Sequence, residues 1–239
     1  MSATNLAVNN RIRVVASFDE LVSARFAGDV NALCWPRALA GDFQEIIDTL
    51  NASLITSDGM TTIDDDDLRA LKLSPAGAAA RDVLLADQAL LRDAGLAPIL
   101  DCITGYPRDD AAGVIPTDVY SFHTDSATVE ADTYLCTYIG GSSEGLANEA
   151  AVRRVDIPET RAQLLSDYGG EDDDGFAAYL SEHCYDLHYA ALPGAASYAF
   201  GIGNLWRIAI AYPGSPVLPC IHRAPLTPPG AAPRLLLIS

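Results

Sequence analysis

Positive charge is scarce in this chain of 239 residues, and the shortage limits the partners that the protein can bind. Lysine and arginine together number 15, against 32 aspartates and glutamates, which gives a formal net charge of -17 and a pI near 4.3. Such a surface repels nucleic acids and anionic membranes. We therefore expect no nucleic-acid or membrane partner, and a small-molecule substrate that is neutral or cationic.

Cross-linking and targeting features are also missing. The five cysteines are scattered without a Cys-x-x-Cys pair, and an odd number cannot all be bridged within one molecule. No apolar run approaches the roughly 20 residues of a membrane-spanning helix. Residues 1–10 lack the basic start and continuous apolar stretch of a secretion signal. Together these absences indicate reduced thiols and a cytoplasmic protein.

Much of the negative charge lies in two runs, Asp64–Asp67 and Glu171–Asp174. Neither run has the alternating ligand pattern of a dedicated calcium loop, so both favour helix starts or solvated loops. Residues 64–96 have helical spacing, with Ser74 as the expected cap directly before a proline. Helical spacing of apolar positions also covers residues 36–50.

Beyond residue 105 the chain changes to short runs of β-branched and aromatic residues, separated by glycine or proline. These expected strands cover residues 119–122, 133–139, 197–201, 206–212, 217–223 and 233–239. Two short helices fall in an insertion at about 156–190. We expect one α+β domain over residues 1–239 that is mostly β with buttressing helices: an N-terminal lead-in with helices over 1–104 packs on a β core over 105–239.

Two of the four histidines and one aspartate form a pattern typical of metal ligands. His123 and Asp125 are two positions apart, so on an extended strand their side chains point to the same side. His222 lies in a second apolar run and supplies a third ligand if the two runs meet. Two imidazoles and one carboxylate leave three positions of an octahedral ion open, as in non-heme Fe(II) oxygenases.

The last apolar run contains a single cation, Arg234, twelve residues after His222. A buried cation needs an anionic partner. A planar guanidinium can hold a carboxylate through two parallel hydrogen bonds, so Arg234 is a candidate anion-binding residue. Arg223, directly after the distal histidine, is a second candidate, and the sequence leaves the choice between them open.

Tyr134 and Tyr138 are expected on one face of the strand that follows His123 and Asp125. Their hydroxyls could bind the carboxylate of a cosubstrate, or they could fill the core and bond to the backbone. The remaining histidines, 183 and 188, are five positions apart and do not stack on one face of a helix. We interpret this pair as structural.

The order His123-x-Asp125, a long interval, His222 and then Arg234 resembles that of the 2-oxoglutarate- and Fe(II)-dependent dioxygenases. The resemblance implies a double-stranded β-helix core of the jelly-roll or cupin-like kind. It implies that His123, Asp125 and His222 ligate Fe(II), and that Arg234 binds the distal carboxylate of 2-oxoglutarate as cosubstrate. It further implies hydroxylation of a small molecule or an amino-acid-like substrate.

Four local segments are similar to an uncharacterised bacterial domain family of unknown function, over a range from about Asn31 to the C-terminus. They are Asn31-Ala-Leu-Cys-Trp-Pro-Arg, Tyr134-Leu-Cys-Thr-Tyr-Ile-Gly-Gly, Gly203-Asn-Leu-Trp and His222-Arg-Ala-Pro. This second resemblance supplies no substrate. Two alternatives stay open: a metal-binding or metal-sensing protein that holds zinc with the same three ligands, and a cupin-like isomerase or lyase, which would need a base near the metal.

Overall fold

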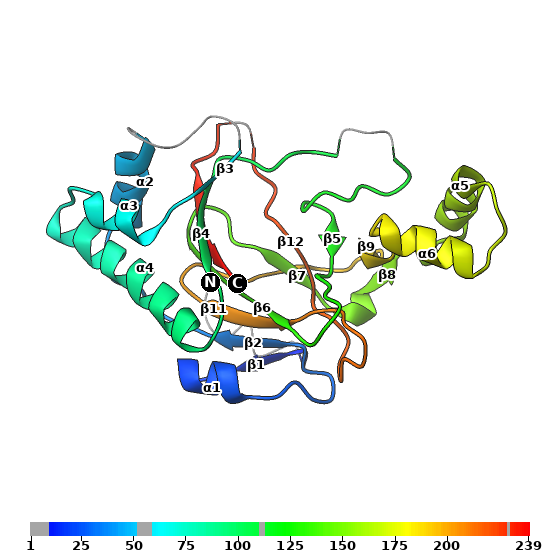
Figure 1. The fold of residues 1–239 in the computed structure, drawn as a ribbon, viewed down its shortest axis with the longest axis horizontal. Coiled ribbons are helices and arrows are strands. Elements are labelled where there is room, and N and C mark those ends of the chain that lie inside the picture. Colours follow the sequence, from blue (N-terminus) through cyan, green and yellow to red (C-terminus); the bar gives the residue numbers. More distant parts are fainter. Residues whose placement is uncertain (1–9, 52–58, 110–112, 229) are drawn as a thin grey trace.

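Two β-sheets form the centre of the molecule, and helices lie on their outer sides (Figure 1). The computed structural model describes residues 10–51, 59–109, 113–228 and 230–239. The N-terminal segment in which we looked for a secretion signal lies almost wholly outside this range. Among the described residues every helix is too short or too polar to cross a bilayer.

The larger sheet has seven strands in the order β1-β2-β11-β6-β13-β4-β3. All neighbours in it are antiparallel except β1 and β2, which are parallel. Its strands are β1 (Ile12–Val14), β2 (Ala32–Trp35), β3 (Met60–Thr62), β4 (Ile99–Ile103), β6 (Asp132–Ile139), β11 (Leu205–Ala209) and β13 (Arg234–Ile238).

The smaller sheet has six strands in the order β10-β7-β12-β5-β9-β8, all antiparallel. Its strands are β5 (Phe122–His123), β7 (Glu144–Leu146), β8 (Ala151–Arg153), β9 (His188–Ala191), β10 (Tyr198–Ala199) and β12 (Ile221–Arg223). From β4 onward the chain passes repeatedly from one sheet to the other. As a result β5 and β12, far apart in sequence, are neighbours.

The expectation of a mostly β protein with flanking helices is confirmed, but the β core does not begin at residue 105. Four strands upstream of that position belong to the larger sheet, and β4 pairs with β13 along its whole length. The insertion at 156–190 also differs, because its last residues begin β9, which pairs with β5. Such short strands carry few alternations, and contacts with residues distant in sequence decide which sheet they join.

Six α-helices are described. They are α1 (Phe18–Ser23), α2 (Phe43–Asn51), α3 (Asp65–Ala70), α4 (Pro75–Asp93), α5 (Pro158–Tyr168) and α6 (Asp174–Glu182). The Ser74 cap is confirmed, since its side chain accepts a hydrogen bond from the backbone N–H of Gly77. The helix expected over 36–50 begins only at Phe43.

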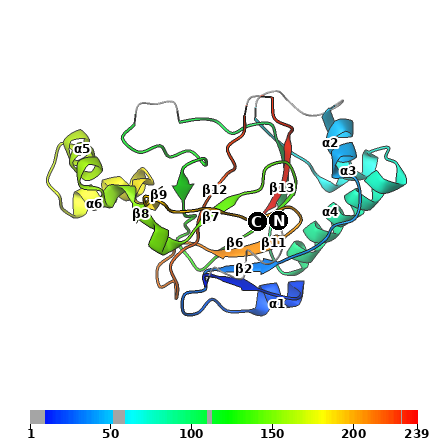
Figure 2. The same ribbon diagram turned by 180° about the vertical axis from the view of Figure 1, so that it is seen from behind.

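Five of the six described helices form two groups at opposite ends of the molecule, and α1 lies apart from them beside β1 and β2 (Figures 1 and 2). Helices α2, α3 and α4 cover the outer side of the larger sheet, while α5 and α6 lie at the far end beside β8 and β9 (Figures 1 and 2). Ile46 of α2 and Leu84 of α4 share one apolar cluster with Leu235 and Leu237 of β13. Each such side chain stabilises the fold by about 2 kcal/mol through removal from water. The helices thus cover one face of the larger sheet, and the smaller sheet packs against its other face.

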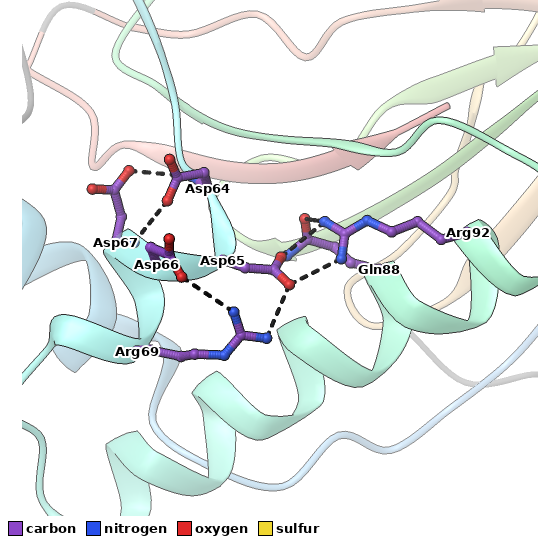
Figure 3. A network of polar contacts seen from close by, with 7 residues as sticks. All are labelled: Asp64, Asp65, Asp66, Asp67, Arg69, Gln88 and Arg92. Atoms are coloured by element: carbon purple, nitrogen blue, oxygen red, sulfur yellow. Dashed lines mark hydrogen bonds and ion pairs between the residues drawn. The ribbon is translucent and has the colours of Figure 1, made fainter.

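Figure 3 shows the first acidic run at the start of α3. The side chain of Asp64 accepts from the backbone N–H of Asp67, and the Asp67 carboxylate accepts from the N–H of Asp64, which forms a capping box. Asp65 accepts from Arg92 of α4 at 2.8 and 2.9 Å and from Arg69 at 3.1 Å. The prediction of a helix start is confirmed. The second run is similar, since its Asp173 caps α6.

Candidate metal centre

Three side chains predicted as ligands converge between the sheets. His123 on β5 lies directly opposite His222 on β12, and Asp125 follows β5. The Asp125 Oδ1 atom is 3.8 Å from His123 Nε2 and 3.7 Å from His222 Nε2. Their donor atoms all lie within 4.8 Å of one another, close enough to share one ion. The sequence prediction that these residues meet is therefore confirmed.

In each candidate ligand, the nitrogen or oxygen that does not face the shared site lies within hydrogen-bond distance of a neighbouring residue. His123 Nδ1 lies 2.8 Å from the carbonyl oxygen of Ser121, and His222 Nδ1 lies 3.4 Å from that of Cys220. We therefore place the ring protons on Nδ1, which leaves both Nε2 lone pairs directed at Asp125. The hydroxyl of Thr133 donates to Asp125 Oδ2 at 2.6 Å and leaves Oδ1 free. Outer hydrogen bonds of this kind orient metal ligands, so the donor set fits a divalent ion.

Burial keeps His123 and His188 neutral. Burial, with the neighbouring imidazole of His222, lowers the pKa of His123 to about 4. Burial, with the charge of Arg154, lowers the pKa of His188 to about 4 as well. At pH 7 both rings therefore carry a free lone pair, which is the form that a metal ion requires.

These low pKa values predict a pH dependence of the metal-free protein. Unfolded histidine titrates near 6.5, so between pH 6.5 and 4 the unfolded chain binds more protons than the folded one, and stability falls as the pH is lowered through this window. The loss is up to roughly 3 kcal/mol for each imidazole. Urea unfolding at pH 7.0, 5.5 and 4.5 measures it. A His188→Gln variant should lose part of the slope, and a slope equal to that of the wild type would contradict the prediction.

Arg234 is buried among neutral groups. Only 5% of it is exposed, and its guanidinium donates to the hydroxyls of Tyr106 at 3.2 Å, Thr137 at 3.0 Å and Ser143 at 2.7 Å. Its Nε is buried without a partner, and no carboxylate of the described residues lies within ion-pair distance. Burial lowers the pKa of Arg234 accordingly. A buried cation without a counter-ion is unfavourable, which points to an anion as the missing partner.

There is space for such an anion beside Arg234. A pocket of about 120 Å³ is lined there by Tyr106, Gly141, Pro225 and Leu226, among other residues. The backbone is adapted to this approach at Gly140, whose φ is +86° and where a Cβ atom would lie 2.8 Å from the Cα of Arg234. Any other residue at position 140 would be strained and would push Arg234 out of place.

The strand register relates this pocket to the metal centre. His222 pairs with Gly145, and Ser143 lies two positions before Gly145, so alternation puts Ser143 on the same face of the sheet as His222. Two residues along a strand correspond to roughly 7 Å. The guanidinium of Arg234 donates to Ser143, so it reaches the chain about that far along from Gly145, the strand partner of His222.

The structure separates the two candidate arginines. Arg223 is already paired with Glu144, whose Oε2 it contacts from Nε at 2.9 Å and from Nη2 at 2.6 Å. Its guanidinium also lies over the ring of Phe122, 4.3 Å from the ring centre. Arg223 therefore has its anion within the chain, whereas Arg234 has none among the described residues.

Tyr134 and Tyr138 do not face the metal centre. Both belong to the apolar cluster on the helix side of the larger sheet. The hydroxyl of Tyr138 donates to Asp87 of α4 at 2.7 Å, and its ring stacks on Phe43 of α2. The expectation that they bind a cosubstrate does not hold, because β6 turns its even-numbered residues toward the helices. Thr137, on the other face of β6, contacts Arg234 instead.

Sequence reasoning missed His188. This residue, interpreted as structural, pairs with His123 across β9 and β5, and the two ring centres are 5.7 Å apart. Its former companion His183 is exposed at the end of α6 and bonds to the carbonyl of Tyr179. The two histidines therefore lie in different elements, and the four residues of β9, His188–Ala191, have no apolar–polar alternation that would have indicated a strand.

No protein-family model matches the chain, and no curated protein matches its sequence.

Proposed function

We propose that the protein is an Fe(II)- and 2-oxoglutarate-dependent oxygenase that hydroxylates a small molecule. His123, Asp125 and His222 are the iron ligands, and Arg234 binds the distal carboxylate of 2-oxoglutarate. The observation that carries the proposal is the guanidinium of Arg234, buried without an anion among the described residues and hydrogen-bonded to Ser143, two residues from the strand partner of His222.

The strand order supports a jelly-roll core, the fold that this function implies. In a jelly roll eight strands form two four-stranded antiparallel sheets, and the chain winds between them. Here β11-β6-β13-β4 are successive neighbours in one sheet, and β10-β7-β12-β5 are successive neighbours in the other. We assign β4, β5, β6, β7, β10, β11, β12 and β13 to these eight positions, with the remaining strands as additions at the sheet edges. The ligands then come from the second and seventh strands, and Arg234 from the eighth.

Each residue of the site has a defined task in this proposal. The two imidazoles and Asp125 hold the ion, and Thr133 fixes the orientation of the carboxylate. Phe200, whose ring centre lies 6.4 Å from that of His222, stacks on Trp206 and forms an apolar wall that excludes water. When bound, Fe(II) and 2-oxoglutarate supply the oxidising chemistry, in which dioxygen converts 2-oxoglutarate to succinate and carbon dioxide while a C–H bond of the substrate is hydroxylated.

The main alternative is a protein that only binds or senses a metal such as zinc. Its three ligands would be the same, since two nitrogens and one oxygen suit zinc as well as iron. Such a protein has no use for a buried arginine that lacks a counter-ion. Arg234 therefore favours the oxygenase.

Anaerobic titration tests the proposed function. Protein loaded with Fe(II) should develop a weak visible charge-transfer absorption as 2-oxoglutarate is added, and should form succinate once oxygen is admitted. 2-Oxobutyrate is the matched control, because it keeps the keto acid but lacks the distal carboxylate that Arg234 binds. It should bind much more weakly. A protein that retains iron but shows neither the absorption nor succinate would be a plain metal binder.

A further inference from the structure

Three histidines form one row across the smaller sheet. His222 pairs with His123, and His123 pairs with His188. Directly paired residues of antiparallel strands point to the same face, so His188 extends the metal centre sideways along the inner face. The last pair between β8 and β9 is Arg153 with Tyr189. Arg154, the next residue, begins a short 3-10 helix (Arg154–Asp156) beyond the end of the row, and its charge acts on His188.

The outer end of this row has unused hydrogen-bonding groups. His188 is only 4% exposed, and its Nδ1 has no partner among the described residues. Arg154 is only partly buried, but its Nε is shielded from solvent and has no partner among the described residues, and no described carboxylate lies within ion-pair distance of its guanidinium. The adjacent Arg153 is the contrast, since Asp156 holds it through two hydrogen bonds at 2.8 and 3.1 Å. Buried donors without partners are unfavourable, so a bound group with acceptor atoms would stabilise this part of the site.

The location fits a substrate and not a second metal. His188 lies outside the group of residues whose donor atoms converge, so it is not a further ligand of the ion. Adjacent strands are roughly 5 Å apart, so the end of β8, which Arg154 directly follows, lies about 10 Å from β5 at the level of the backbone. A small molecule held at its end by Arg154 and His188 would present its other carbons beside His123.

We propose that Arg154 and His188 bind the carboxylate of an amino-acid-like substrate, an inference that rests on the proposed oxygenase function. A guanidinium fork and an imidazole N–H match the two oxygens of a carboxylate. A phosphate dianion fits less well, because there is one arginine and the whole chain has a formal charge of -17. An amino acid carries the carboxylate without net charge and so agrees with the acidic composition.

The acidic groups near this subsite do not compete for it. Asp109 and Asp118 act electrostatically on His188. Both are engaged locally: Asp109 accepts from the backbone and hydroxyl of Thr117, and Asp118 accepts from the backbone N–H groups of Tyr120 and residue 121. They leave Arg154 without an ion-pair partner among the described residues.

Ligand panels test the carboxylate subsite. Thermal shifts of the full chain are measured with L-amino acids, with their carboxamides, with acetate and butyrate, and with inorganic phosphate. The measurements are made on metal-free protein and again anaerobically with Fe(II) and 2-oxoglutarate. At least one amino acid should bind while its carboxamide does not, and binding by the simple acids alone would assign the subsite to a carboxylic acid that lacks the amino group. Preferential binding of phosphate, equal binding of acid and amide, or no binding by any of these compounds would overturn the proposal.

Variants assign the binding to Arg154. Calorimetry with the best acid should give a dissociation constant at least tenfold higher for Arg154→Gln than for the wild type, and an unchanged one for Arg153→Gln, the matched control. Circular dichroism checks that both variants fold. Equal affinity of Arg154→Gln and the wild type would refute the subsite. If the 2-oxoglutarate absorption is absent while acid binding still depends on Arg154, the oxygenase proposal fails and the subsite stands.

Discussion

Replacing His222 by alanine is expected to lower metal affinity by more than about 100-fold. Loss of an outer hydrogen bond to a ligand already costs about 10- to 100-fold, and His222 supplies one of the three converging donor atoms themselves. With Nε2 removed, His123 and Asp125 alone would be left to hold the ion. Iron content after anaerobic loading and desalting measures the effect, together with calorimetric titration of a redox-stable divalent ion.

His183→Ala is the matched control for this prediction. His183 is exposed and bonds only to the carbonyl of Tyr179 in its own helix among the described residues, so its removal should leave metal binding unchanged. Since alanine at position 222 also removes buried packing, the unfolding midpoint of each variant is compared without metal. A folded His222→Ala protein that retains one equivalent of iron with wild-type affinity would refute the assignment of the ligands.

Arg234→Gln is expected to abolish measurable 2-oxoglutarate binding while iron is retained. Loss of one partner from a buried charge pair costs about 2–5 kcal/mol, which is a 30-fold or larger loss of affinity. The glutamine should be tolerated by the fold, because Arg234 has no counter-ion among the described residues and the substitution removes a buried charge. Arg234→Lys keeps the charge but not the fork, and should recover affinity only in part.

Arg223→Gln is the control that separates the two arginines. Its guanidinium pairs with Glu144 at 2.6 Å, so its loss should leave the charge-transfer absorption and its 2-oxoglutarate dependence intact. If Arg223→Gln instead lost 2-oxoglutarate binding while Arg234→Gln kept wild-type affinity, Arg223 would be the cosubstrate-binding residue, and it would have to break its ion pair with Glu144 to act as one. Iron content is determined for both variants, so that loss of the metal is not mistaken for loss of the anion site.

Local patterns in the sequence predicted several parts of the structure. The capping residue Ser74, the helix start at Asp64 and the shared face of His123 and Asp125 depend on neighbours within a few positions. The proximity of His222 to His123 and Asp125 was also predicted. That prediction came from the residue order that the chain shares with the 2-oxoglutarate-dependent dioxygenases, and not from interactions between neighbouring residues.

Other features depend on which strands pair. The side chains of β6 alternate between the two faces of the sheet, so the sequence predicts that Tyr138 and Thr137 lie on opposite faces. Only the position of α2 and α4 decides that Tyr138 faces the helices and Thr137 faces Arg234. Likewise the sequence does not distinguish Arg223 from Arg234 as the anion-binding residue. Only the pairing of β12 with β7 shows that Arg223 already has Glu144 as its partner.

The sequence by itself determined an acidic, mostly β chain with well-capped helices and one triad of candidate ligands, because composition, caps and alternation act over short distances along the chain. Only the tertiary structure decided that N-terminal strands complete the larger sheet, that His188 extends the ligand row, and that Arg234 is the buried cation without an anion among the described residues. The physical reason is that cross-strand register and burial are set by contacts between residues distant in sequence, and alternation within one strand cannot specify its partner.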